Sequence, residues 1–449
     1  MKDFILKTTI LFLTLLVITE INTQVRDSTA KNQQKALGIP ANVLSGKFNP
    51  DPKAQWFPRA GLGLFIHWGI AAIDGGIDLS WGMLANKSWI NDGTVTPNEY
   101  YELIKKWNPS NFDMDKLLKL AKEAGFRYAV FVTKHHDGFT FWPSNYGEIG
   151  TKKTFNGRDF VREFSNACEK YGLKKGFYYS PPDWYFDRQY RNWSYDDSVW
   201  LDMNHKIATK KIEPSNHDSL RTSMVKGQLY ELLTNYGKVD LMWFDGGNGE
   251  LPNSEVRALQ PGIVINRRNN ESGDYNDTEG RLPDKRFYGW FETCDPCWPT
   301  HWWSYSSSDT YDDASTFLTN LIKLRAWGGN YLANIGPLPD GSIPKCVYSI
   351  WNEIAVWMKH SGESVYETTA GYYPEKSSVP TTNKTNITYC FALPGFQGSI
   401  VLSGVEKPNK IVLLRNKQEI SYVFKNGILS INIPAHFRTQ LPDVVKIVW

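Results

Sequence analysis

One pattern occurs three times between residues 113 and 244 and constrains the fold of this chain more than any other feature. Each copy is an amphipathic helical run that ends at a glycine, followed by a short apolar strand with polar residues at its end. The copies are Asp113 to Gly125 with Tyr128 to Lys134, Arg158 to Gly172 with Lys175 to Ser180, and Ser223 to Gly237 with Val239 to Phe244. Alternating helices and strands need crossover connections, so the sequence predicts a parallel sheet covered by helices.

Further apolar stretches bring the number of candidate strands to about seven: Gly61 to Trp68, Gly262 to Asn266, Arg286 to Phe291 and Asn330 to Ile335. No Gly-x-Gly-x-x-Gly turn follows any of them, so a doubly wound dinucleotide-binding sheet loses its main support. We therefore predict an α/β fold, a (β/α)8-like TIM barrel. In such barrels the chemistry lies at the carboxyl ends of the strands.

The pattern changes after a helix near Ile350 to His360. Stretches rich in Thr, Ser, Pro and Asn then separate short apolar or alternating runs such as Ile411-Val412-Leu413-Leu414. This alternation predicts a small antiparallel β-sandwich. We therefore expect the barrel over residues 25–362 and the β-sandwich domain over residues 363–449.

The N-terminus predicts a signal peptide over residues 1–24. Charged residues open the chain, and an apolar run follows from about Thr8 to Ile18. This arrangement is typical of secretory signals, and the run is too short to span a membrane. We expect a secreted or periplasmic protein with no membrane attachment after signal cleavage.

Composition limits the possible partners and cofactors. The 50 Lys and Arg nearly balance the 47 Asp and Glu, so no basic footprint indicates nucleic acid. The 18 Trp and 23 Tyr offer flat faces that suit sugar rings, although most of them belong in a core. Cys294 and Cys297 form a Cys-x-x-Cys pair, free or bridged, without the further ligands of a zinc site. We expect no metal there.

Polar residues at the predicted strand ends should share one rim of the barrel. These ends are His67-Trp68, His135-His136-Asp137, Tyr178-Tyr179-Ser180, Asp245-Gly246-Gly247 and Asn266-Arg267-Arg268. Glycoside hydrolysis needs two carboxyl groups. Asp-Gly-Gly alone would indicate an ordinary turn, but the rim that Asp245 shares with His67, His135 and Arg268 favours a catalytic role.

The second carboxyl group has two candidates. Glu292 lies at the end of a predicted strand among several tryptophans, where an apolar setting would raise its pKa toward that of a general acid. Glu279 lies in a polar stretch that predicts a solvated loop. His135 and His136 can serve one pocket only at a strand end or bulge, because successive strand residues face opposite sides. The alternatives are a core histidine at His67, His135 or His136 and a surface ion pair at Arg268.

These segments resemble glycoside hydrolase family 29, the retaining α-L-fucosidases. The resemblance covers about residues 55 to 365 and is carried by Gly63 to Gly69, by Lys134-His135-His136-Asp137-Gly138-Phe139 and by Trp243-Phe244-Asp245-Gly246. It implies Asp245 as nucleophile, a fucosylated oligosaccharide or polysaccharide as substrate, and no cofactor. It further implies Glu292 as acid/base, through a Trp-Glu-Thr-Cys-like stretch, and as substrate-binding residues His67, Trp81, His135, His136, Tyr178, Trp243 and Arg268.

The chain departs from the family pattern at two positions. Ser80 precedes Trp81 where many relatives carry a glutamate, and Arg267 replaces an aspartate. The added positive charge of Arg267 would suit a sulfated glycan or simply point to solvent. We expect an exo-acting retaining α-L-fucosidase. The alternatives are an inactive sugar-binding barrel and an α-L-galactosidase, because α-L-galactosides differ from fucosides only at carbon 6.

Overall fold

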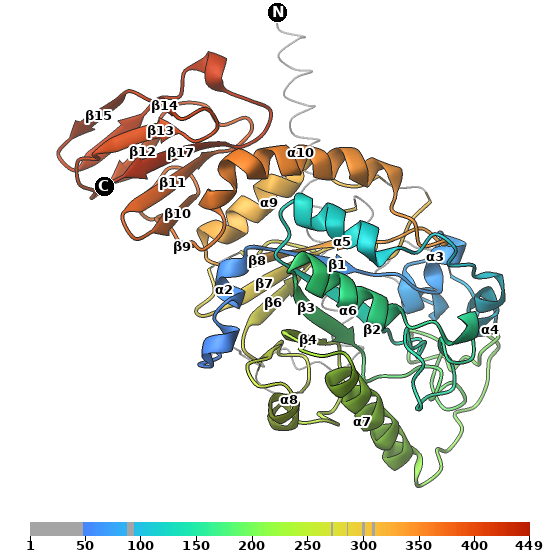
Figure 1. Cartoon of the computed structure of the whole chain (residues 1–449). Helices are drawn as coiled ribbons and strands as arrows, with labels where there is room; N and C mark the ends of the chain where they lie inside the picture. The colour runs from blue at the N-terminus through green and yellow to red at the C-terminus, as the bar shows by residue number, and fades with distance from the viewer. Residues whose placement is uncertain (1–47, 88–93, 271–272, 285, 299–300, 308–309) are drawn as a thin grey trace, which may run out of the picture.

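The computed structural model describes residues 48–87, 94–270, 273–284, 286–298, 301–307 and 310–449. It consists of a curled parallel sheet surrounded by helices, followed by two antiparallel sheets at the C-terminal end (Figure 1). The predicted signal peptide lies outside the described residues. Within them, no helix combines the length and the apolar character that crossing a membrane requires.

The parallel sheet has eight strands in the order β5-β4-β3-β2-β1-β8-β7-β6. Its edge strands approach each other, because Asn266 and Tyr275 form a parallel bridge and Asp274 N donates to Ile265 O at 2.8 Å. The predicted TIM-like barrel is therefore confirmed. Its strands are β1 (Leu62–Ile66), β2 (Tyr128–Lys134), β3 (Lys174–Tyr179), β4 (Leu241–Phe244), β5 (Val264–Ile265), β6 (Asn276–Glu279), β7 (Phe291–Asp295) and β8 (Asn330–Ile335).

Helices cover the outside of this sheet (Figure 1). Asp113 and Asp159 cap the first turns of α5 and α6 by accepting bonds from Lys116 N and Arg162 N, which leaves the apolar faces of both helices free to pack inward. The helices are α2 (Phe57–Ala60), α3 (Ala71–Asp74), α4 (Pro97–Glu102), α5 (Met114–Glu123), α6 (Phe160–Tyr171), α7 (His217–Asn235), α8 (Asn253–Leu259), α9 (Ala314–Ala326) and α10 (Lys345–Ser361).

Two strand predictions are wrong in the same region. The stretch predicted as a solvated loop is strand β6, and the strand predicted from Arg286 to Phe291 is β7, which only begins at Phe291. β6 has no apolar residue to mark it, and its carboxylates Asp277 and Glu279 are neutralised by arginine side chains instead of by water. Because β7 begins later than predicted, Glu292 is the second residue of the strand and does not lie at its end.

The C-terminal region is the predicted antiparallel β-sandwich, with one sheet in the order β14-β13-β17-β11-β10-β9 and a second in the order β12-β16-β15. Arg325 of α9 ties it to the barrel by donating to the carbonyls of Val365 and Thr368. The strands are β9 (Thr369–Ala370), β10 (Thr381–Lys384), β11 (Ile387–Ala392), β12 (Ile400–Ser403), β13 (Lys410–Leu413), β14 (Gln418–Glu419), β15 (Tyr422–Lys425), β16 (Ile428–Ile431) and β17 (Asp443–Val448).

Candidate active site

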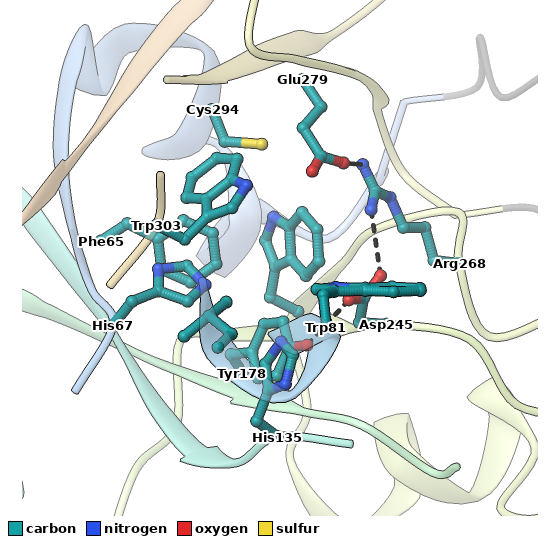
Figure 2. A pocket seen from close by; sticks show the side chains of 12 residues that line it. Phe65, His67, Trp81, His135, Tyr178, Asp245, Arg268, Glu279, Cys294 and Trp303 are labelled. Carbon is teal, nitrogen blue, oxygen red and sulfur yellow. Dashed lines mark hydrogen bonds and ion pairs between the residues drawn. The ribbon is translucent and has the colours of Figure 1, made fainter. Parts of the chain in front are cut away.

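A pocket of about 370 Å³ opens at the carboxyl ends of the barrel strands (Figure 2). Aromatic rings form most of its wall, and two carboxylates and an arginine lie on one side (Figure 2). The lining residues are Phe65, His67, Leu79, Trp81, His135, Tyr178, Trp243, Asp245, Arg268, Glu279, Cys294 and Trp303.

Asp245 follows β4 directly, and its side chain is only 11% exposed. Oδ2 accepts a bond from the Tyr178 hydroxyl at 2.7 Å, and Oδ1 accepts one from Arg268 Nη1 at 3.0 Å. Burial raises the pKa of Asp245 above its ordinary value, while Arg268 and Tyr178 oppose this rise by stabilising the carboxylate. Both oxygens are therefore held in place by donors from neighbouring elements.

Arg268 joins three carboxylates. Besides Asp245, it binds Asp277 through Nε at 2.6 Å and Glu279 through Nη2 at 2.9 Å, and its guanidinium lies 4.5 Å from the ring centre of Trp243. Burial alone would raise the pKa of Asp277, but Arg268 and Arg267 lower it overall. The surface ion pair considered for Arg268 is excluded, because its side chain is 2% exposed.

Glu279 thus belongs to the pocket and is not solvated surface. Its side chain is 11% exposed, and it shares the Arg268 guanidinium with Asp245 (Figure 2). Burial raises the pKa of Glu279; Arg268 opposes this effect and the negative charge of Asp245 adds to it. A second carboxyl group therefore lies beside Asp245, with its proton affinity tied to the charge on Asp245.

Glu292 lies deep in the barrel and does not line the pocket. Its side chain is fully buried and accepts bonds from the Tyr128 hydroxyl at 2.5 Å and from Trp243 Nε1 at 3.2 Å. Burial raises the pKa of Glu292 to about 7, although both bonds oppose the rise. The raised pKa expected from the sequence is present, but Trp243 stands between this carboxyl group and the pocket.

The three histidines predicted to bind substrate gather here, with His67 and His135 lining the pocket and His136 beside Asp245. β2 ends at Lys134, after a register shift between Val132 and Lys134, so His135 and His136 both lie beyond the regular strand. Burial lowers the pKa of His67 to about 3 and the pKa values of the other two well below the ordinary value. All three rings are neutral at physiological pH.

Aromatic packing holds these groups in position. Tyr178 stacks on Trp243 on one side and on His135 on the other, with ring centres 5.5 and 5.6 Å apart. Trp81, which lies in a short 3-10 helix (Leu79–Met83), meets His136 edge-on at 5.4 Å. Trp303 covers His67 at 4.9 Å. The structure thus brings every predicted substrate-binding residue to this rim.

Within the described residues, one set of side chains could converge on a metal ion, namely His135, His136 and Asp245. Arg268 is already paired with Asp245, so its positive charge opposes a divalent cation there. Cys294 and Cys297 are free thiols, as are Cys168, Cys346 and Cys390. The Cys-x-x-Cys pair is therefore not a bridged pair in this structure.

Sequence reasoning missed four pocket residues: Phe65, Leu79, Cys294 and Trp303. It also misjudged Asp277, which orients Arg268 from behind the pocket. The polar stretch Asn276 to Glu279 carries no periodic signal of its own. The count of about seven candidate strands was the available hint, because a TIM barrel needs an eighth and the interval between Asn266 and Arg286 was long enough to hold it.

The chain matches one family model and several curated proteins. The family model described as alpha-L-fucosidase matches residues 30–363. The tissue alpha-L-fucosidase of Bos taurus is 25% identical over 375 residues, which are 76% of this chain and 75% of the bovine protein. The tissue alpha-L-fucosidase of Homo sapiens is 25% identical over 371 residues, 73% of this chain and 74% of the human protein.

Solved structures show the same similarity. An alpha-L-fucosidase from Bacteroides thetaiotaomicron, trapped as a covalent intermediate with 2-fluoro-fucosyl fluoride, superposes with a TM-score of 0.75 at 27% identity, covering 91% of this chain and 99% of that one. Alpha-L-fucosidase isoenzyme 1 from Paenibacillus thiaminolyticus gives a TM-score of 0.74 at 27% identity, covering 88% of this chain and 98% of the other.

Proposed function

This chain belongs to the alpha-L-fucosidase family, and from that membership we propose that it is an exo-acting retaining α-L-fucosidase with Asp245 as nucleophile and Glu279 as general acid/base. The observation that carries the proposal is the Arg268 guanidinium, which holds both carboxylates at one side of a pocket lined by aromatic rings. A retaining mechanism needs two such groups near each other on the rim.

Asp245 is suited to attack the anomeric carbon. Arg268 and Tyr178 bind its two oxygens and favour the carboxylate, which is the nucleophilic form. The same two donors fix its orientation, so little conformational freedom remains to be lost when the substrate binds. Attack by this carboxylate would give a covalent fucosyl-enzyme, and water would then release fucose with its configuration retained.

Glu279 is suited to exchange roles between the two steps. While Asp245 is charged, it raises the pKa of Glu279 and favours the protonated form that a leaving group needs. Once Asp245 forms the glycosyl ester, its negative charge disappears and the pKa of Glu279 falls. Glu279 then becomes the base that activates water, as microscopic reversibility demands.

Glu292 is the competing acid/base candidate, favoured by likeness to the family's Trp-Glu-Thr-Cys stretch. We assign it a structural role, because its carboxyl group bonds Tyr128 and Trp243 inside the barrel. Through Trp243 it supports the pocket wall from behind. The nearby Glu279 also argues against the inactive sugar-binding barrel, because that alternative depended on a missing second carboxyl group.

Glu279→Gln and Glu292→Gln separate the two candidates. With Glu279 as acid/base, Glu279→Gln loses kcat/KM on fucosides with poor leaving groups by about 10²-fold or more, keeps kcat/KM on activated aryl fucosides, whose leaving groups need no proton, and yields fucosyl azide of retained configuration when azide is added. Glu292→Gln should show none of these three signatures. The opposite distribution of the signatures between the two variants would assign the acid/base role to Glu292.

The prediction of a sulfated glycan as substrate depends on Arg267. Its Nε donates to Asp277 at 2.9 Å, and its side chain is 13% exposed, so its charge is largely committed within the protein. A sulfated glycan therefore stays a prediction without structural support. Hydrolysis of matched sulfated and unsulfated fucosides tests it, and an α-L-galactoside in the same panel tests the isosteric alternative.

We also propose that residues 1–24 direct export and are removed. The support is the charged start and the apolar run of the sequence. N-terminal sequencing of the protein recovered outside the producing cell should show a new N-terminus near residue 25. Recovery of the uncleaved chain from the cytosol would contradict export.

A further inference from the structure

His67 ends β1, where Asn334 of the neighbouring strand β8 meets its ring. The pairing register places Phe65 opposite Asn334, and the His67 Nδ1 atom lies 2.8 Å from Asn334 Oδ1. Both side chains are buried. The other ring nitrogen, Nε2, remains available to the pocket that His67 lines (Figure 2).

The orientation of the Asn334 amide follows from its second partner. Asn334 Nδ2 donates to the backbone carbonyl of Trp303 at 2.8 Å. A carbonyl oxygen only accepts hydrogen bonds, so a flipped amide would bring two oxygen atoms together there. The amide oxygen must therefore face His67, and His67 Nδ1 must carry the proton that it donates to this oxygen.

A neutral imidazole has one N–H group, so protonation at Nδ1 leaves a lone pair on Nε2. Burial, which lowers the pKa of His67 to about 3, prevents a second proton from binding Nε2 at working pH. The chain from the Trp303 carbonyl through Asn334 to His67 thus determines the hydrogen-bonding role of a nitrogen in the pocket.

Resting on the proposed fucosidase function, we propose that Asn334 is a positioning residue that fixes His67 in the Nδ1–H tautomer, so that His67 Nε2 accepts a hydrogen bond from a sugar hydroxyl and cannot donate one. The pocket then requires a hydrogen-bond donor at this position of the sugar. Substituents that only accept, such as fluorine or a methyl ether, are rejected there.

His136 has a different kind of partner. Its Nδ1 lies 2.5 Å from the Ser180 hydroxyl, whose single proton can go to that nitrogen or to the Pro182 carbonyl at 3.2 Å, so no partner fixes the tautomer of His136 as Asn334 fixes that of His67. His136 Nε2 is buried without a hydrogen-bond partner, 3.5 Å from Asp245 Oδ2.

The first test reads the tautomers directly. Long-range ¹H–¹⁵N correlation spectra of ¹⁵N-histidine-labelled enzyme resolve Nδ1–H from Nε2–H forms, and His67→Gln identifies the His67 signals among the eight histidines. We expect His67 in the Nδ1–H form across pH 5 to 8. An Nε2–H pattern, or a mixture, would overturn the proposal. This readout does not depend on turnover, whereas hydrolysis of an aryl fucoside by the unaltered enzyme tests the proposed function separately.

The second test measures discrimination against 2-, 3- and 4-deoxyfucosides as ratios of kcat/KM. For one of the three analogues, we expect Asn334→Ala to lower the kcat/KM ratio of the fucoside to the deoxyfucoside about 10-fold, because either tautomer of His67 is then allowed. Asn111→Ala is the matched control, because it removes an exposed amide that does not line the pocket. Unchanged ratios in a folded Asn334→Ala variant would contradict the role of Asn334.

Asn334→Asp provides a contrasting variant. One carboxylate oxygen still accepts from Nδ1–H and raises the pKa of His67 by its charge, while the other replaces the donor to the Trp303 carbonyl, so KM is compared across pH within this variant. As His67 gains a second proton at acid pH, Nε2 becomes a donor, and KM should rise about 10-fold at low pH and recover at high pH. A KM that does not vary with pH in this variant would count against the acceptor role.

Discussion

Replacing Arg268 with methionine removes the guanidinium that bridges Asp245, Asp277 and Glu279. The arginine side chain is 2% exposed, and the three carboxylates are 11%, 1% and 11% exposed, so water cannot replace the lost contacts. Breaking a buried ion pair by deleting one partner typically costs about 3 to 5 kcal/mol. We expect a loss of unfolding free energy in that range, limited by protonation of the carboxylates left behind.

The loss should depend on pH. The folded-state pKa of Asp277 is lowered, so this carboxylate contributes stability above its unfolded pKa and loses that contribution as pH falls through the folded value. Deleting Arg268 removes the contribution, so the two proteins should differ most near neutral pH and converge in acid. The pKa of Asp245 rises further in the variant, which should move the acid limb of kcat/KM to higher pH.

Urea unfolding at pH 4 and pH 7, together with pH profiles on an aryl fucoside, measures both effects. Arg267→Met is the matched control, because Arg267 bonds Asp277 but does not line the pocket. It should cost less stability and leave the acid limb in place. If Arg268→Met unfolds like the unaltered protein at pH 7, or keeps its acid limb, the bridging role assigned to Arg268 is refuted.

Three further predictions follow from the site. Burial holds the pKa of Glu292 at about 7 against an ordinary 4.5. The folded protein should therefore lose roughly 3 kcal/mol of unfolding free energy as the pH rises from 4.5 to 7. Urea unfolding of Glu292→Gln over the same pH range should not show this loss. Trp81→Phe trims the wall against His136 and should raise KM about 10-fold with little change in melting temperature; an unchanged KM would remove Trp81 from the pocket. EDTA should leave kcat unchanged, since Arg268 opposes a cation at Asp245; activity lost to EDTA and restored by Zn²⁺ would show a metal requirement.

The barrel and the residues at the strand ends could be predicted from sequence because apolar strands mark their own ends. His67, Tyr178 and Asp245 each follow or end such a strand, and parallel strands bring these ends to one rim. β6 could not be predicted in this way. Its carboxylates pair with Arg267 and Arg268, and hydrophobic periodicity gives no signal of such ion pairs.

The placement of Glu292 was misjudged for a related reason. The aromatic run before it looks like the body of a strand, whereas β7 begins only at Phe291 and carries Glu292 at its buried start. A difference of a few residues in where β7 begins therefore moves Glu292 from the rim to the barrel interior. Tertiary charge pairing and strand register, which determine where Glu279 and Glu292 lie, are both long-range properties.

The most direct measurement for Asp245 is peptide mapping by mass spectrometry after brief exposure to 2-fluoro-fucosyl fluoride. Fluorine at carbon 2 slows breakdown of a covalent intermediate, so a retaining enzyme should accumulate one fucosyl adduct. We predict a single adduct on the peptide that contains Asp245, absent from Asp245→Ala. An adduct on another residue would contradict the assignment of Asp245 as the nucleophile.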